Sequence, residues 1–236
     1  MYAEKSCLVF LMLSAISVYG ENATDYFNRG LKSTSTRTKI KYFSKALELA
    51  PNLTEAYEKR GMLYFFQEKF DNVIEDYQTF IELSPPKSEA YRMLGMGYLK
   101  KGDYRSAIYN FTRAIEIDSK NASAYADRAE AHFLSGNYDL TVLDSTRAIE
   151  IGGNPRDIAD AYRTRAKAFR KTDRNDLSAA DIRSSWQIDP RYAYYYKALY
   201  GYASPEGMRK AGLIAVIGIA FLLLFKFKVK PPEKDE

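Results

Sequence analysis

The chain has 236 residues, of which 46% are hydrophobic and 28% charged, so it has enough apolar residues for a globular domain and is not disordered throughout. Its formal net charge of +5 is concentrated beside an apolar stretch near the C-terminus, which argues against a nucleic-acid-binding surface. Because Cys7 is the only cysteine and His132 the only histidine, the sequence forms neither a disulfide framework nor a Cys/His zinc site.

The N-terminus carries a run of mostly apolar residues, 7–19, behind a short head that contains Lys5. A short apolar run of this kind is typical of a secretory signal peptide, and it is too short for a membrane-spanning helix. We therefore expect residues 1–20 to be a signal peptide, with cleavage before Glu21. The alternative is an uncleaved apolar helix that packs on the following domain.

The middle of the chain repeats itself at a spacing of 34 residues. Tyr57, Tyr91 and Tyr125 are separated by that interval, and the pattern resumes at Tyr162 after a three-residue insertion. Residues 88–102 place apolar side chains at positions i, i+3, i+4 and i+7, as amphipathic helices do. Because no helix pair in such an array buries its apolar face alone, consecutive pairs have to stack on one another.

This pattern resembles the tetratricopeptide repeat, a unit of two helices with small and aromatic residues at fixed positions. In the best-matching part of the chain these positions are held by Gly95, Tyr98, Ala107 and Phe111. The resemblance implies an all-α solenoid of about five helix-turn-helix repeats, followed by a capping helix. The expected bounds are a degenerate first repeat at 21–53, repeats at 54–87, 88–121, 122–158 and 159–192, and a capping helix with linker at 193–207.

A second apolar stretch lies close to the C-terminus. Residues 211–225 contain no charged side chain, and the segment 208–229 is long enough to cross a hydrocarbon core of about 30 Å if its flanking basic residues point outward. We expect a transmembrane helix over 208–229 and a short tail over 230–236, and a buried core helix is the alternative. Ala211, Ala215 and Gly218 share one helix face, which would permit a homodimer through this helix.

The two apolar segments together predict the topology. A cleaved signal peptide places the repeats on the exported side of the membrane, in a bacterial periplasm or a eukaryotic ER or secretory lumen, with the C-terminus in the cytoplasm. In a lumen, Asn-x-Ser/Thr triplets are glycosylation acceptors, although the same residues are also common in turns and helix caps. These triplets begin at Asn22, Asn52, Asn110 and Asn121.

In the tetratricopeptide-repeat family, the first helix of each repeat lines a concave groove that binds peptides or extended segments. Carried over by position, the resemblance implies a groove that changes from acidic and apolar at its N-terminal half to basic at its C-terminal half, which would orient a bound segment. Single members of this set can equally be solvated helix positions. The expected groove residues are Glu55, Glu58, Met62, Phe65, Phe66, Glu89, Arg92, Met96, Lys100, Glu130, Phe133, Arg163, Lys167, Arg170 and Lys171.

The sequence contains no metal-ligand cluster, nucleotide-binding loop or nucleophile motif, so we expect neither an enzyme nor a bound cofactor. The leading hypothesis is a membrane-anchored scaffold that binds a peptide or extended segment of a partner protein in the concave groove, on the exported face. The alternative is a tail-anchored cytosolic adaptor with an uncleaved N-terminal apolar helix.

Overall fold

The described part of the protein consists of helices joined in pairs by short turns. The computed structural model describes residues 22–189, and this range contains ten helices and no strand. The all-α architecture of about five helix pairs is therefore confirmed. The pairs are α2 (Ala23–Lys32) with α3 (Thr36–Leu49), α4 (Thr54–Phe66) with α5 (Phe70–Leu83), α6 (Ser88–Lys101) with α7 (Tyr104–Ile117), α8 (Ala122–Leu134) with α9 (Tyr138–Ile151), and α10 (Pro155–Lys171) with α11 (Asn175–Ile188).

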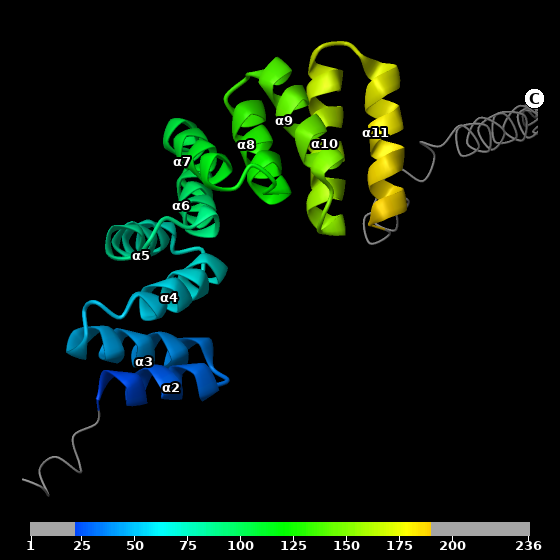
Figure 1. Ribbon diagram of the computed structural model, residues 1–236. Coiled ribbons are helices and arrows are strands. Elements are labelled where there is room, and N and C mark those ends of the chain that lie inside the picture. Colours follow the sequence, from blue (N-terminus) through cyan, green and yellow to red (C-terminus); the bar gives the residue numbers. More distant parts are fainter. Residues whose placement is uncertain (1–21, 190–236) are drawn as a thin grey trace, which may run out of the picture.

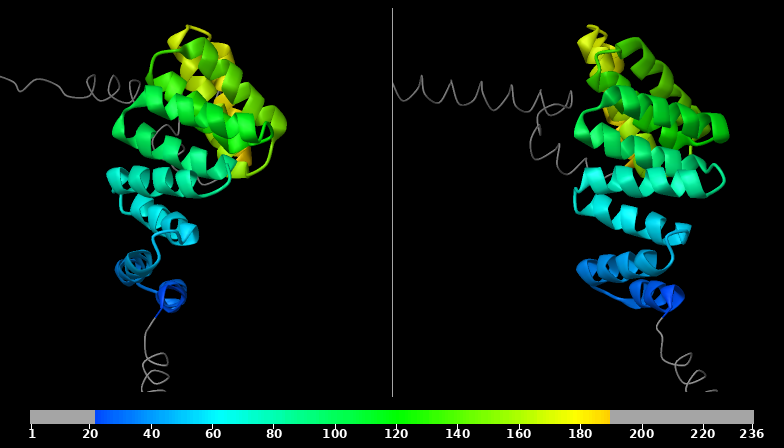
Figure 2. Two further views of the ribbon diagram at one scale, coloured as in Figure 1. Left: turned by 60° about the vertical axis from the view of Figure 1, so that its left-hand side comes forward. Right: turned by 90° about the vertical axis from the view of Figure 1, so that its left-hand side faces the viewer.

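The pairs follow one another along a curved stack that runs from α2 at one end to α11 at the other (Figure 1). Two views from other sides show the helices laid across the length of this stack (Figure 2). Each helix packs mainly against the helices directly before and after it in the chain. This nearest-neighbour arrangement is the one expected of a repeat solenoid.

Several expected elements lie outside the described residues: the signal peptide at 1–20, the capping helix and linker at 193–207, the transmembrane helix at 208–229 and the tail at 230–236. Within residues 22–189, none of the helices combines the length and the hydrophobicity that a membrane crossing requires.

The first helices of the second to fifth pairs, α4, α6, α8 and α10, begin at residues 54, 88, 122 and 155. Asn154 caps α10 by accepting a hydrogen bond of 2.9 Å from the backbone N–H of Arg156. Proline is well suited to the first helical position, where its missing N–H has no partner to lose. Asn154 and Pro155 therefore set the start of α10.

The two helices of the second and third pairs approach closely because a glycine of the first helix lies against an aromatic ring of the second. A Cβ atom on Gly61 would lie 2.9 Å from the ring of Tyr77, and one on Gly95 would lie 2.7 Å from the ring of Phe111. Both rings are buried. The large ring thus occupies the space that a side chain on the glycine would need, which preserves close packing.

Three pairs are also joined by a buried ion pair that the sequence analysis did not anticipate. In each, an arginine of the first helix donates from Nε and Nη2 to both carboxylate oxygens of an aspartate sixteen residues later, on the second helix. Such bidentate contacts fix the direction of both side chains. The pairs are Arg60 with Asp76 at 3.0 and 2.7 Å, Arg128 with Asp144 at 2.8 and 2.8 Å, and Arg165 with Asp181 at 2.8 and 2.8 Å.

The same guanidinium groups also reach back to the preceding repeat. The Nη1 atoms of Arg60, Arg128 and Arg165 donate to a hydroxyl group on the second helix of the pair before. The acceptors are Ser44 at 2.9 Å, Thr112 at 3.0 Å and Thr146 at 2.9 Å. One arginine thereby connects three helices and two repeats.

The third pair departs from this arrangement. Leu94 and Asn110 occupy the positions of the arginine and the aspartate, and both are buried. The Asn110 amide nitrogen donates to the backbone oxygen of Ser106 at 2.8 Å, so it makes its contact within its own helix. Gln78, on the second helix of the preceding pair, occupies the position that Ser44, Thr112 and Thr146 hold at the other contacts between repeats. Its amide nitrogen donates to the Tyr98 hydroxyl at 3.0 Å. A cavity of about 380 Å³ lies beside these residues.

The third pair suggests a test of the ion pair in the fourth. Arg128→Leu alone leaves the buried Asp144 carboxylate without its bidentate cation, so we expect the free energy of unfolding to fall by about 3–5 kcal/mol. The double variant Arg128→Leu/Asp144→Asn reproduces the Leu94/Asn110 combination and should recover most of that loss. Urea denaturation measures both. A double variant no more stable than the single one would contradict this account.

His132 holds the position that Tyr64, Tyr98 and Phe169 hold in neighbouring repeats. It is buried, and its Nε2 atom lies 3.7 Å from Asp144 Oδ2. Burial lowers the pKa of the imidazole below its ordinary value of 6.5, Asp144 opposes that shift, and Arg128 adds to it.

Because the pKa of His132 is lower in the folded than in the unfolded chain, its stabilising contribution is present above pH 6.5 and is lost as the pH falls. The variant His132→Phe carries the residue that the fifth repeat has at this position, Phe169. When the pH is lowered from 7.5 to 5.5, this variant should therefore lose less stability than the wild type. Melting temperatures at the two pH values measure the difference. An equal loss in both proteins would show that His132 does not contribute to the pH dependence of stability.

Candidate groove for a partner segment

The first helices of the second to fifth pairs share a hollow on the inner side of the stack. Its volume is about 500 Å³, and its described lining comes only from α4, α6, α8 and α10. We call this hollow the inner groove. Its lining residues are Phe65, Arg92, Met96, Lys100, Ala126, Asp127, Glu130, Arg156, Asp157, Asp160, Arg163, Thr164 and Lys167.

The structure brings about half of the expected groove residues together in this hollow. These are Phe65, Arg92, Met96, Lys100, Glu130, Arg163 and Lys167. The others lie on the same four helices but outside the lining: Glu55, Glu58, Met62, Phe66, Glu89, Phe133, Arg170 and Lys171. The role of all fifteen as partner contacts stays a prediction.

Asp127, Arg156, Asp157 and Thr164 line the inner groove although the sequence analysis did not select them. Arg156 and Asp157 belong to the first turn of α10, which the sequence pattern had assigned to the preceding repeat. The Asn154-Pro155 pair, a capping residue followed by proline, is the signal that could have identified this earlier start.

Arg92 lies at the centre of the charges in the inner groove. Its Nε and Nη2 atoms donate to Glu89 at 2.8 and 2.7 Å, and its Nη1 atom donates to Asp127 Oδ2 at 2.7 Å. The contact with Asp127 joins α6 to α8 across two repeats. About 20% of each of these two side chains is exposed, so the pair lies at the bottom of the groove.

The surroundings of this pair shift both pKa values. Burial raises the pKa of the Asp127 carboxyl to about 6, although the charge and hydrogen bond of Arg92 oppose the shift. Burial also acts against the charged form of Arg92, but its contacts with Glu89 and Asp127 outweigh this and raise the pKa of the guanidinium. Arg92 therefore stays charged while Asp127 titrates at mildly acidic pH.

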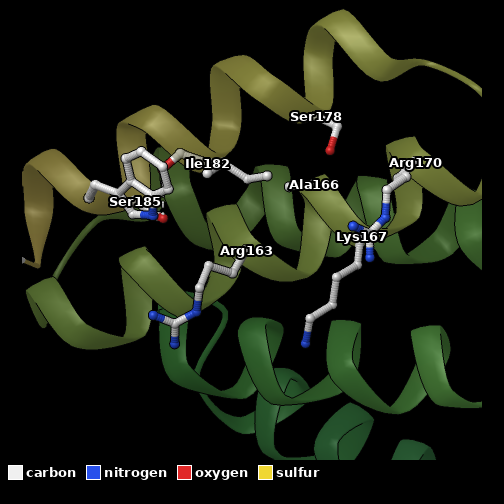
Figure 3. A pocket seen from close by; sticks show the side chains of 8 residues that line it. Arg163, Ala166, Lys167, Arg170, Ser178, Ile182 and Ser185 are labelled. Atoms are coloured by element: carbon white, nitrogen blue, oxygen red, sulfur yellow. Dashed lines mark hydrogen bonds between the residues drawn. The ribbon is translucent and has the colours of Figure 1, made fainter. Parts of the chain in front are cut away.

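The basic C-terminal half of the groove is partly neutralised by its own carboxylates. Arg163 forms an ion pair with Asp160, one turn earlier on α10, and Ser123 donates a hydrogen bond to Asp157. Figure 3 shows Arg163 and Lys167 extending from α10 on the side away from Ser178 and Ser185 of α11. Both side chains point into the stack of first helices, but only Lys167 keeps a charge that is available for a partner.

Three cations of the inner groove, Lys100, Arg156 and Lys167, form no ion pair with any residue between 22 and 189. Lys167 Nζ lies 5.8 Å from the centre of the Phe133 ring. Glu130 is likewise without a cationic partner in this range. The groove therefore offers apolar surface from Phe65 and Met96 together with charges that its own residues do not satisfy.

The four expected glycosylation acceptors differ in their surroundings. Asn22 and Asn52 are exposed. Asn121 caps α8, and its amide nitrogen donates to Ser88 Oγ at 2.8 Å. Asn110 is buried with its amide nitrogen bonded to Ser106, so the folded chain has no room for a glycan on that nitrogen. The repeat uses these two asparagines for packing and capping, which leaves Asn22 and Asn52 as the accessible candidates.

Residues 22–189 contain no group of three or more His, Cys, Asp or Glu side chains placed to hold a metal ion.

Two family models match the chain. One, for the TPR repeat, covers residues 95–136, and the other, for the tetratricopeptide repeat, covers residues 54–87. The chain therefore contains tetratricopeptide repeats over these residues. Tetratricopeptide repeats form a scaffold family without enzymatic activity, and they imply binding of a protein or peptide partner. No curated protein matches the chain.

Solved structures share the fold of this tetratricopeptide-repeat protein. The MamA protein is 23% identical with a TM-score of 0.63, over 73% of this chain and 94% of that one. MamA 41-end from Desulfovibrio magneticus RS-1 is 15% identical with a TM-score of 0.64, over 73% and 97%. YrrB, described as a TPR protein with an unusual peptide-binding site, is 19% identical with a TM-score of 0.62, over 80% and 97%.

Proposed function

We propose that this tetratricopeptide-repeat scaffold binds an extended segment of a partner protein along the inner groove. The observation that carries the proposal is the lining of that groove by first helices of four consecutive repeats, with apolar and unpaired charged side chains facing one hollow of about 500 Å³. A hollow that continues from repeat to repeat suits a ligand that is itself extended. Apolar contacts supply affinity in such a site, and charges supply orientation.

The unpaired charges on the first helices differ between α4 and α10. Glu55 and Glu58 on α4 form no ion pair within residues 22–189, and neither do Lys167, Arg170 and Lys171 on α10. A partner segment with an acidic end would therefore place that end against α10. Complementary charge of this kind also raises association rates at low salt.

Charge reversal at the basic end tests the proposal. Lys167→Glu/Arg170→Glu leaves the Arg163–Asp160 pair in place, so we expect an unchanged melting temperature and partner binding reduced about tenfold. Partner capture by the wild type and by this variant is compared by photo-crosslinking from benzoylphenylalanine placed at the position of Met96 in the groove. Mass spectrometry then maps the captured segment. Benzoylphenylalanine at the position of the exposed Tyr109 on α7 is the control. Equal crosslinking from both positions would exclude the groove as the binding site.

We also propose that the repeats are held at a membrane on its exported face. The support comes from the sequence alone: the apolar segment at 7–19, the apolar segment within 208–229 and the basic residues beside it. The competing arrangement is a tail-anchored cytosolic adaptor that keeps its N-terminal apolar segment.

Protease protection on sealed vesicles distinguishes the two arrangements. With tags at residue 21 and at the C-terminus, we expect the repeats to be protected, the tail to be clipped, and the intact mass to correspond to a chain that begins at Glu21. A digested repeat domain that retains Met1, with a protected tail, would instead establish the cytosolic adaptor.

A further inference from the structure

We propose that the partner segment alternates apolar and acidic side chains about three residues apart, and that the C-terminal turns of α4, α6, α8 and α10 bind this alternation. The inference rests on the proposed function, because it assigns the chemistry of the segment that the inner groove holds.

The last turns of the four first helices alternate in character along the stack. The turn of α4 is aromatic, that of α6 is cationic, that of α8 is apolar and that of α10 is cationic. We call this row the alternating rim. It consists of Phe65 and Phe66 on α4, Lys100 on α6, Phe133 and Leu134 on α8, and Arg170 on α10, together with Lys167 one turn earlier on α10.

Two apolar members of the alternating rim are exposed, and its aromatic members pack against neighbouring rings. Phe66 is 75% exposed and Leu134 is 45% exposed. The Phe65 ring centre lies 6.3 Å from that of Phe66 and 6.0 Å from that of Phe70, and the Phe133 ring centre lies 5.7 Å from that of Tyr138. Because neighbouring rings already fix the aromatic side chains of the rim, a partner's apolar side chain can cover them with little loss of conformational freedom.

The cationic members of the rim carry charge that the chain itself does not neutralise. Lys100, Lys167 and Arg170 form no ion pair among the described residues, whereas Arg92 and Arg163 deeper in the groove are bound to carboxylates. Glu130, a carboxylate of the groove lining on α8, forms no ion pair with these cations and is a single negative charge against three positive ones. The rim therefore keeps an excess of positive charge, which favours acidic side chains in the partner.

The spacing of the helices gives the spacing of the partner's side chains. Of these first helices, α8 and α10 pack directly against each other. Packed helices lie about 8–10 Å apart, and an extended chain advances about 3.3 Å per residue, so the step from α8 to α10 corresponds to about three partner residues. With the same step between the other first helices, the expected pattern from α4 to α10 is apolar-x-x-acidic-x-x-apolar-x-x-acidic. A segment of this kind places each apolar residue on a ring and each carboxylate beside a cation.

Selection from a phage-displayed library of random peptides tests the inference on the full-length chain. We expect the wild type to enrich peptides with apolar and acidic residues three positions apart. The variant Lys100→Glu/Lys167→Glu should lose the acidic preference and bind the wild-type consensus peptide about tenfold more weakly in fluorescence anisotropy. The matched control is Lys41→Glu/Lys120→Glu, which makes the same charge change at exposed positions away from the rim and should select the wild-type pattern.

The outcomes separate this inference from the proposed function. Enrichment of peptides without the apolar and acidic spacing, or the same pattern selected by the wild type and by Lys100→Glu/Lys167→Glu, would overturn the inference while leaving peptide binding in place. The absence of any enrichment by the wild type over a column without protein would overturn the proposed function itself. Loss of the pattern in the rim variant alone supports both.

Discussion

Each helix pair of this protein has more apolar surface than it can cover by itself, and the neighbouring pair has to supply the cover. In one core cluster, Val73, Tyr77 and Phe80 of α5 lie with Ala90 and Met93 of α6, which belongs to the next repeat. A second cluster joins Leu99 and Ala107 to Ala131 of the following repeat in the same way. Such shared clusters make the repeats mutually dependent, and the resulting stack leaves the first helices side by side along one face. The inner groove exists because of that stacking.

Apolar burial alone does not fix how far one repeat is rotated or shifted against the next, because it has no preferred direction. The guanidinium groups of Arg60, Arg128 and Arg165 add that direction. Each has to meet a carboxylate within its own repeat and a hydroxyl group in the preceding one. Buried ion pairs often contribute little net stability compared with apolar side chains of the same size. The Leu94/Asn110 pair shows that an uncharged solution also packs, so we assign the arginines chiefly to the geometry of the junctions.

The sequence predicted the fold well because the 34-residue spacing, the tyrosines and the glycines report local helix packing, which recurs in every copy. It predicted the groove less completely. Arg92 and Asp127 are 35 residues apart and belong to different repeats, so single-helix patterns could not show that they neutralise each other. The Arg–Asp ion pairs left a visible signal, an arginine and an aspartate sixteen residues apart at three repeat positions. Asn110 resembled a surface triplet in the sequence because burial is decided by the neighbouring helix and not by the triplet itself.

The reach of each arginine into the preceding repeat also restricts the order in which these units can follow one another. If the fourth repeat were duplicated in tandem, the second copy could pack on the first. The copy of Arg128 in the second repeat would meet Thr146 of the first, a hydroxyl group like that of Thr112, which Arg128 contacts now. Deletion of residues 88–121 would instead bring Arg128 against the amide of Gln78, whose oxygen accepts hydrogen bonds but is carried on a longer side chain than the hydroxyl groups of Ser44, Thr112 and Thr146. A gene rearrangement that duplicates the fourth unit therefore keeps the hydroxyl contact at its new junction, whereas a loss of the third unit replaces that contact with an amide.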